Sequence, residues 1–169
     1  MKASTRYAIV VAVLAFLIFV ILPQLFTGPN NFDEKKNITS FKVSGLSMEP
    51  EFKHNEIVEV DKSAYTQLSL QIGDVIAFQF EHLDNPMIKR VVGIPGDIIK
   101  IEDGWLWINQ EKKISSGKFN NGVWKQGESY TINQNKYFVL SDNNSIGEDS
   151  RIWGLVSKKD IIGKVASKL

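Results

Sequence analysis

A serine and a lysine are the two residues of this sequence whose surroundings best suit covalent chemistry. Ser47 lies in Ser44–Pro50 (Ser-Gly-Leu-Ser-Met-Glu-Pro), which predicts a tight turn just after a strand. A serine hydroxyl is a weak nucleophile and needs a base within hydrogen-bond reach. Lys89 interrupts the apolar strand pattern of Met87–Gly93. Burial lowers the pKa of a lysine, and a neutral amine can act as a base. We therefore predict a Ser/Lys pair.

Each of these residues also has an ordinary structural explanation. Most serines in turns only cap or hydrogen-bond locally, and a lysine in a strand can point to solvent from a sheet edge. The two histidines, His54 and His82, stand in no recognisable triad pattern, so Lys89 is the better candidate for the base.

A third polar block favours the functional interpretation. Ser141–Arg151 (Ser-Asp-Asn-Asn-Ser-Ile-Gly-Glu-Asp-Ser-Arg) follows directly on an apolar strand pattern. A loop this rich in polar groups usually places side chains for a purpose. The alternative is a solvated loop closed by an ion pair between Asp149 and Arg151.

Composition limits the class of protein. The chain has 169 residues, which fits one domain with or without an appendage, and 43% of them are hydrophobic, as in ordinary globular proteins. Lys and Arg (20) balance Asp and Glu (19), so charge gives no case for nucleic acid as a partner. The absence of cysteine excludes a disulfide framework and a thiolate metal site.

The N-terminal segment predicts a membrane anchor. Residues 1–6 form a short polar leader, and residues 7–26 are almost entirely apolar. As a helix rising about 1.5 Å per residue, this run spans roughly 30 Å, enough to cross a bilayer. A cleaved signal peptide has the same layout, but no small-residue cleavage pattern follows the run. Residues 27–37 are expected to be a polar linker.

Beyond the linker the sequence predicts a mainly β domain over residues 38–169. Ser63–Leu70 is the one weak helix candidate, Asp103-Gly104 predicts a hairpin turn, and Ser115–Ser129 is expected to be an exposed excursion. Strands are expected from apolar runs and alternation at Phe41–Val43, Ile57–Val60, Asp74–Phe80, Ile98–Glu102, Trp105–Ile108, Tyr137–Leu140 and Ile161–Val165.

Three ordered blocks resemble the boxes of type I signal peptidases, membrane-anchored Ser/Lys endopeptidases that remove signal peptides. Ser44–Pro50 resembles the family's S-x-x-S-M-x-P box, and Lys89–Asp97 (Lys-Arg-Val-Val-Gly-Ile-Pro-Gly-Asp) resembles its lysine box. Ser141–Arg151 resembles its G-D-N-R-x-x-S-x-D-S-R box. The resemblance implies a compact antiparallel β catalytic domain with one N-terminal transmembrane helix.

The same resemblance implies roles for particular residues. Ser47 would be the nucleophile, with its backbone N–H as an oxyanion donor, and Lys89 the general base. No metal or cofactor is needed for this chemistry. The residues expected to support the oxyanion and the site are Gly45, Asp142, Ser145, Asp149, Ser150 and Arg151.

Location and partners also follow from the resemblance. It implies a single-pass protein of the cell membrane, with a cytoplasmic N-terminus and the catalytic domain on the outer face. Lys35 and Lys36 offset Lys2 and Arg6, so charge alone signals the orientation only weakly. The expected partners are preproteins with signal peptides, the lipid bilayer and the protein translocation machinery.

The sequence departs from the family pattern at four positions. Glu51 stands where threonine is common, Ser141 replaces a glycine, and Asn144 replaces an arginine. Gly147 takes the place of a serine that can hydrogen-bond the catalytic lysine. Ser145 is the nearby candidate to replace that serine.

Two other functions compete with the signal peptidase interpretation. One is a catalytically silent paralogue that binds peptides or belongs to a secretion complex, and the altered third box keeps it open. The other is a self-cleaving repressor-type Ser/Lys peptidase, which would carry a DNA-binding domain in place of the anchor.

Overall fold

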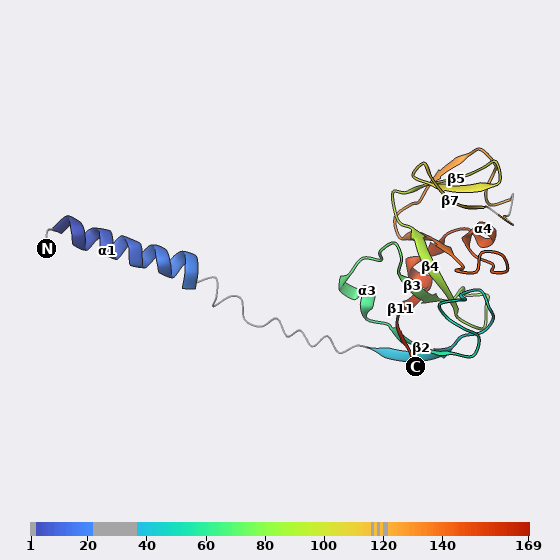
Figure 1. Ribbon diagram of the computed structural model, residues 1–169, viewed down its shortest axis with the longest axis horizontal. Helices are drawn as coiled ribbons and strands as arrows, with labels where there is room; N and C mark the ends of the chain where they lie inside the picture. The colour runs from blue at the N-terminus through green and yellow to red at the C-terminus, as the bar shows by residue number, and fades with distance from the viewer. Residues whose placement is uncertain (1–2, 22–36, 116, 118, 120–121) are drawn as a thin grey trace. The chain divides into compact units, whose positions relative to one another are not determined.

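The computed structural model describes residues 3–21, 37–115, 117, 119 and 122–169 (Figure 1). The chain divides into two compact units, Met1–Lys35 and Lys36–Leu169. The predicted linker 27–37 lies outside the described residues except for Asn37, as do residues 22–26 of the predicted anchor.

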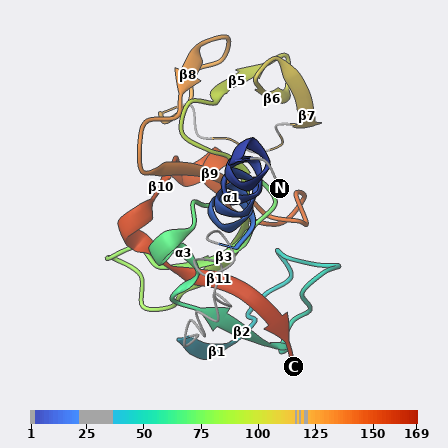
Figure 2. The same ribbon diagram turned by 90° about the vertical axis from the view of Figure 1, so that its left-hand side faces the viewer.

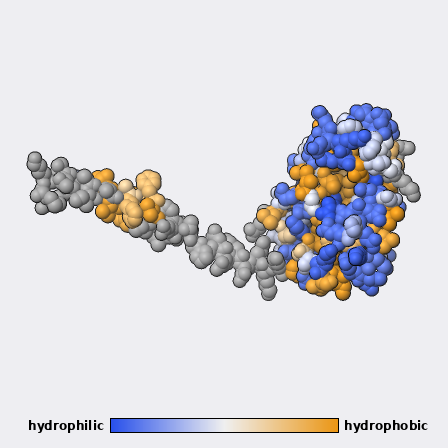
Figure 3. Space-filling view, in the orientation of Figure 1, coloured by the Kyte–Doolittle hydropathy of each residue, from blue (hydrophilic) through white to orange (hydrophobic). Residues whose placement is uncertain are grey.

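The described part of the N-terminal unit, residues 3–21, is one helical segment. Helix α1 covers Ala3–Phe16 and continues as the π-helical turn η1, Leu17–Ile21. The helix therefore begins inside the expected leader. Its large apolar side chains described between Tyr7 and Val20 are all exposed, and several appear orange in Figure 3. Among the residues that the structure describes, no helix has both the length and the apolar character needed to cross a membrane.

The unit Lys36–Leu169 is built from antiparallel sheets, as the sequence predicts (Figure 2). In its described part, one sheet has seven strands in the order β1-β2-β11-β3-β4-β9-β10 and the other has four in the order β7-β6-β5-β8. The strands of the larger sheet are β1 Ile38–Lys42, β2 Ile57–Asp61, β3 Val75–Phe78, β4 Met87–Gly93, β9 Lys136–Leu140, β10 Val156–Ser157 and β11 Ile161–Lys168. Those of the smaller sheet are β5 Ile98–Glu102, β6 Trp105–Ile108, β7 Glu111–Ser115 and β8 Ser129–Thr131. Short helical turns are α3 Ala64–Gln67, α4 Ser150–Trp153 and η2 Lys158–Asp160.

The central position of β3 explains its continuous apolar sequence. It pairs with β11 on one side and β4 on the other, and all of its residues are buried. A strand covered on both faces needs apolar residues at every position rather than at alternate ones. The strand predicted at Asp74–Phe80 is therefore confirmed, although it extends over Val75–Phe78 only.

The predicted hairpin between β5 and β6 is also confirmed. Asp103 and Gly104 connect the two strands with φ of 51° and 75°. Positive φ at both central residues is the requirement of the tight turn that matches strand twist, and Asp-Gly meets it at low cost.

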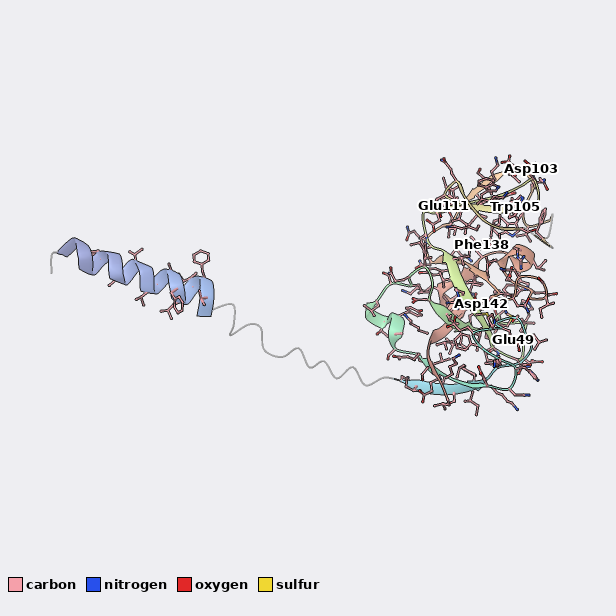
Figure 4. All side chains as sticks on the ribbon, viewed as in Figure 1. Glu49, Asp103, Trp105, Glu111, Phe138 and Asp142 are labelled. Carbon is pink, nitrogen blue, oxygen red and sulfur yellow. The ribbon has the colours of Figure 1, made fainter. Side chains whose placement is uncertain are left out.

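The two sheets share a hydrophobic core. Ile99, Ile101, Leu106 and Ile108 of the smaller sheet are buried in one cluster with Phe138 and Leu140 of β9. Figure 4 shows Phe138 between the smaller sheet, where Asp103, Trp105 and Glu111 lie, and the region of Asp142 and Glu49. This packing fixes β9, and with it the start of the polar block that follows Leu140.

Two predictions about irregular segments need correction. Ser115–Ser129 is not simply an exposed excursion, because Trp124 is buried and its Nε1 donates to Ser150 O at 2.8 Å. Helix α4 was not predicted, since the sequence offered Ser63–Leu70 alone as a helix candidate. Strands β7, β8 and β10 were also missed, and their polar or very short sequences explain why.

Candidate active site

The turn that carries Ser47 is held at its base by strand-like hydrogen bonds. After β1, Val43 N donates to Glu56 O at 2.8 Å and Asn55 N donates to Val43 O at 2.9 Å. Gly45 then adopts φ of +87°, a conformation that a side chain disfavours. Its N–H donates to His54 Nδ1 at 3.0 Å. These contacts hold the base of the turn from which Ser47 meets β4.

Lys89 lies on β4, between β3 and β9, and is buried with 5% of its surface exposed. Its Nζ lies 2.9 Å from Ser47 Oγ and also donates to Ile88 O at 3.1 Å. The predicted nucleophile and the predicted base are therefore in hydrogen-bond contact. The alternative of a solvent-facing lysine at a sheet edge is wrong, because β4 is an inner strand.

Burial changes the acidity of Lys89. Desolvation of the ammonium lowers its pKa to about 8, and the nearby carboxylates of Asp149, Asp142 and Glu148 oppose that shift. An amine with a pKa near 8 is partly neutral at physiological pH, as a general base requires.

The third block forms a buried brace behind this pair. Asp149, fully buried, accepts from Ser141 N at 3.0 Å and from Arg151 Nη2 at 2.8 Å. Its other oxygen accepts from Arg151 Nε at 2.8 Å and from Arg151 N at 3.2 Å, which caps α4. Ser150 Oγ accepts from Val139 N at 2.9 Å. The predicted ion pair is present, but it is buried rather than part of a solvated loop.

Asp142 makes a separate ion-pair network with Arg90. Arg90 Nε and Nη2 donate to the two carboxylate oxygens of Asp142, each at 2.8 Å. The same Nη2 lies 2.6 Å from Glu51 Oε2. Glu51, a departure from the family pattern, therefore supplies a second carboxylate to Arg90. Sequence reasoning did not single out Arg90, although its place beside Lys89 in the lysine box was the signal available.

A cavity of about 430 Å³ opens onto the Ser47–Lys89 pair. Apolar side chains of β1, the serine turn and β4 provide much of its wall, together with Ser44 and Asn85. Sequence reasoning did not assign Asn85–Ile88 to the site. These residues reach the cavity because they immediately precede Lys89 at the start of β4. The residues that line the cavity are Phe41, Lys42, Val43, Ser44, Ser47, Met48, Asn85, Pro86, Met87, Ile88 and Lys89.

Ser145 and Asn144 of the third block make no hydrogen bond to Ser47 or Lys89 among the described residues. Ser145 is exposed, and none of the hydrogen bonds between described residues joins it to Lys89. Asn144 contributes its backbone O, which accepts from Arg151 Nη2 at 3.1 Å, while its buried Oδ1 has no partner among the described residues. The described residues contain no group of three or more His, Cys, Asp or Glu arranged to hold a metal ion.

A serine hydroxyl in contact with a buried amine of lowered pKa, facing a cavity in a β domain, is the arrangement of a serine hydrolase. Comparisons with known proteins specify the class further. The family model "Signal peptidase, peptidase S26" matches residues 4–169. Signal peptidase IB of Staphylococcus aureus is 32% identical over 146 residues, covering 76% of each chain. Signal peptidase I V of Bacillus subtilis is 29% identical over 140 residues, covering 75% of this chain and 82% of that protein.

A crystal structure of a signal peptidase I from Enterococcus faecalis is also similar, at 24% identity and a TM-score of 0.43, covering 59% of this chain and 98% of that one. The family match over nearly the whole chain confirms the resemblance read from the three boxes. The chain belongs to the signal peptidase family, peptidase S26, and is a serine endopeptidase.

Proposed function

We propose that this protein removes N-terminal signal peptides from secreted preproteins, with Ser47 as nucleophile and Lys89 as general base. The observation that carries the proposal is the 2.9 Å contact between Lys89 Nζ and Ser47 Oγ at the wall of a cavity. That distance lies within the range over which a base takes a proton directly.

In the first half-reaction, neutral Lys89 accepts the hydroxyl proton as Ser47 Oγ attacks the scissile carbonyl carbon. The tetrahedral intermediate then collapses, the C–N bond breaks, and the Lys89 ammonium returns the proton to the departing amine. An acyl-enzyme ester on Ser47 remains.

In the second half-reaction, Lys89 takes a proton from water as the water oxygen attacks the ester. The ester bond breaks and the proton returns to Ser47 Oγ. The net change is hydrolysis of one peptide bond, with no redox partner or cofactor involved.

The backbone N–H of Ser47 is the proposed oxyanion donor. Within the described residues it makes no hydrogen bond, while the carbonyl of Ser47 accepts from Asn143 N at 2.9 Å. The bond from Asn143 N holds the turn in place and leaves the N–H of Ser47 available to an oxyanion. Removing a donor of this kind costs about 2.7–4 kcal/mol of transition-state stabilisation. Gly45 supports the donor by allowing the positive φ of the turn.

The cavity walls suit a signal-peptide cleavage site. Phe41, Val43, Met48 and Ile88 present apolar surface next to the reactive pair, and signal peptides end in small residues that bury little surface and fit restricted pockets. The brace formed by Asp149, Ser150 and Arg151 holds this site in place, and the ion pair of Asp142 stabilises the neighbouring strand.

The proposed location is the cell membrane. Residues 7–26 form a single-pass anchor after a cytoplasmic leader (1–6), and a linker (27–37) leads to the peptidase domain 38–169 on the outer face. The exposed apolar side chains of α1 support this assignment, since burying them in lipid is far more favourable than leaving them in water. Preproteins, the bilayer and the translocation machinery are the proposed partners.

The test is cleavage of a preprotein by the purified full chain in detergent, with product masses read by mass spectrometry. Ser47→Ala and Lys89→Met should both abolish cleavage, whereas the exposed-residue controls Ser69→Ala and Lys159→Met should cleave like the parent. Cleavage that persists in Ser47→Ala would refute the assignment of the nucleophile. A parent that binds but never cleaves signal peptides would instead identify a silent paralogue.

A further inference from the structure

Ser141 directly follows the last residue of β9, next to the position that pairs with β4. Strands β4 and β9 are antiparallel, with Arg90 opposite Leu140. One step along this register sets Lys89 opposite Ser141. Directly opposite residues project from the same face with Cβ atoms about 4.5–5.5 Å apart. Both side chains are buried, with 5% and 2% of their surface exposed. Among the described residues Lys89 Nζ bonds to Ser47 Oγ and Ile88 O, and Ser141 Oγ bonds to Glu148 O, so no hydrogen bond joins the two side chains in this structure.

The side chain of Ser141 occupies the space beside Gly147. A Cβ added to Gly147 would lie 2.0 Å from Ser141 Oγ and 2.4 Å from Ser141 Cβ. The same position is 3.0 Å from Ser47 Cβ. The hydroxyl of Ser141 therefore lies where a side chain at position 147 would otherwise be, at the edge of the Ser47–Lys89 pair.

The hydrogen-bonding capacity of a neutral amine explains what this hydroxyl can do. Neutral Lys89 has two N–H groups and one lone pair, and the lone pair must face the Ser47 hydroxyl when it accepts the proton. Ile88 O accepts one N–H at 3.1 Å. The second N–H needs another acceptor, because Ser47 Oγ must then act as donor. Ser141 Oγ donates to Glu148 O at 3.3 Å, which leaves its own lone pairs available.

We propose that Ser141 is a positioning residue that accepts an N–H of neutral Lys89 and turns the lone pair towards Ser47, and that Gly147 is required because it leaves room for the Ser141 side chain. This inference rests on the proposed function. It accounts together for two departures from the family pattern, a serine where glycine is usual and a glycine where serine is usual. In this role the hydroxyl of Ser141 rotates from Glu148 O towards Lys89 Nζ, and its burial distinguishes it from the exposed Ser145.

Two double variants that differ in a single hydroxyl test the proposal. Ser141→Gly with Gly147→Ser moves the hydroxyl to the other wall, and Ser141→Gly with Gly147→Ala fills the same space without one. Using the purified full chain, detergent and a preprotein substrate, we expect the first to keep kcat within about threefold of the parent and the second to lose about tenfold or more. Their melting temperatures should agree, since their packing is nearly the same.

Single variants supply a second measurement. Ser141→Ala introduces no clash and should lower kcat about tenfold with KM unchanged, because the hydroxyl acts on the chemical step rather than on substrate binding. Gly147→Ser alone should lose activity and melting temperature through its contact with Ser141, and adding Ser141→Gly should restore both.

The outcomes separate this inference from the proposed function. Equal kcat for the two double variants, or parental kcat in Ser141→Ala, overturns the role of Ser141 while leaving the Ser47–Lys89 pair in place, provided that Ser47→Ala is inactive. Cleavage that survives Ser47→Ala overturns the proposed function and this inference with it.

Discussion

Replacement of Lys89 by methionine separates catalysis from stability. Methionine has a similar length and no charge, so it fills the buried position on β4 without an ammonium group. The base is lost, and cleavage should fall by at least the about 10²–10⁴-fold that a positioned base contributes. Stability should not fall with it, because the native lysine is itself a cost to the folded state.

The size of that cost follows from the pKa of Lys89. Burial lowers the pKa from 10.5 to about 8, and each unit corresponds to about 1.36 kcal/mol. Below pH 8 both the folded and the unfolded chain carry the proton, so the full cost of about 3 kcal/mol is present. Between pH 8 and 10.5 only the unfolded chain holds it, and stability rises with pH. Above 10.5 the cost is gone.

Methionine removes this cost but also loses the contacts of Nζ with Ser47 Oγ and Ile88 O. Each such hydrogen bond contributes about 0.5–1.5 kcal/mol net. At pH 7 we therefore expect Lys89→Met to be as stable as the parent or up to about 3 kcal/mol more stable. The advantage should shrink as the pH approaches 10.5.

The assay pairs preprotein cleavage with melting temperature at pH 7 and pH 10, on the parent, Lys89→Met and the exposed control Lys159→Met. Retained cleavage would refute Lys89 as the base. Lost cleavage with a large fall in melting temperature at pH 7 would show instead that Lys89 is a charged, structurally paired lysine, and another base would have to be found.

Three further predictions concern the pH profile, the brace and the N-terminal segment. In the parent, log kcat/KM should rise by about one per pH unit and level off above pH 8, since only neutral Lys89 is active. A pH–rate profile with its midpoint near pH 6.5 would instead indicate a histidine as the base. Asp149→Ala should lower the free energy of unfolding by about 3–5 kcal/mol in urea titrations, because it removes the carboxylate that pairs with buried Arg151. Exposed Ser145→Ala should change it by less than about 0.5 kcal/mol, and the reverse order would contradict the proposed brace. A truncated chain beginning at Asn37 should still cleave peptides in detergent, since the boxes lie within the compact unit Lys36–Leu169; an inactive but folded truncated chain would show that catalysis needs the N-terminal segment.

Local patterns were enough to predict much of the sheet structure. The apolar run within Asp74–Phe80 indicated the strand that became β3, and Asp103-Gly104 indicated the hairpin of β5 and β6. These features depend on neighbouring residues, because strand burial and turn geometry impose their requirements over a few positions of the chain. Trp124 shows the limit, since its polar surroundings predicted exposure while a core that includes Phe138 buries it.

The site shows the same difference between what local sequence predicts and what tertiary contacts decide. Residue types and box order identified Ser47 and Lys89 as a candidate pair from the sequence alone. Only the tertiary structure decided that Lys89 lies on an inner strand, 2.9 Å from Ser47 Oγ, and that Asp142 pairs with Arg90. The sequence offered Ser145 as a nearby candidate to bond the lysine, and the register of β4 and β9, extended by one position, adds Ser141 as a second candidate. Contacts between residues far apart in the chain depend on how strands pair and how side chains share space, and local sequence contains neither.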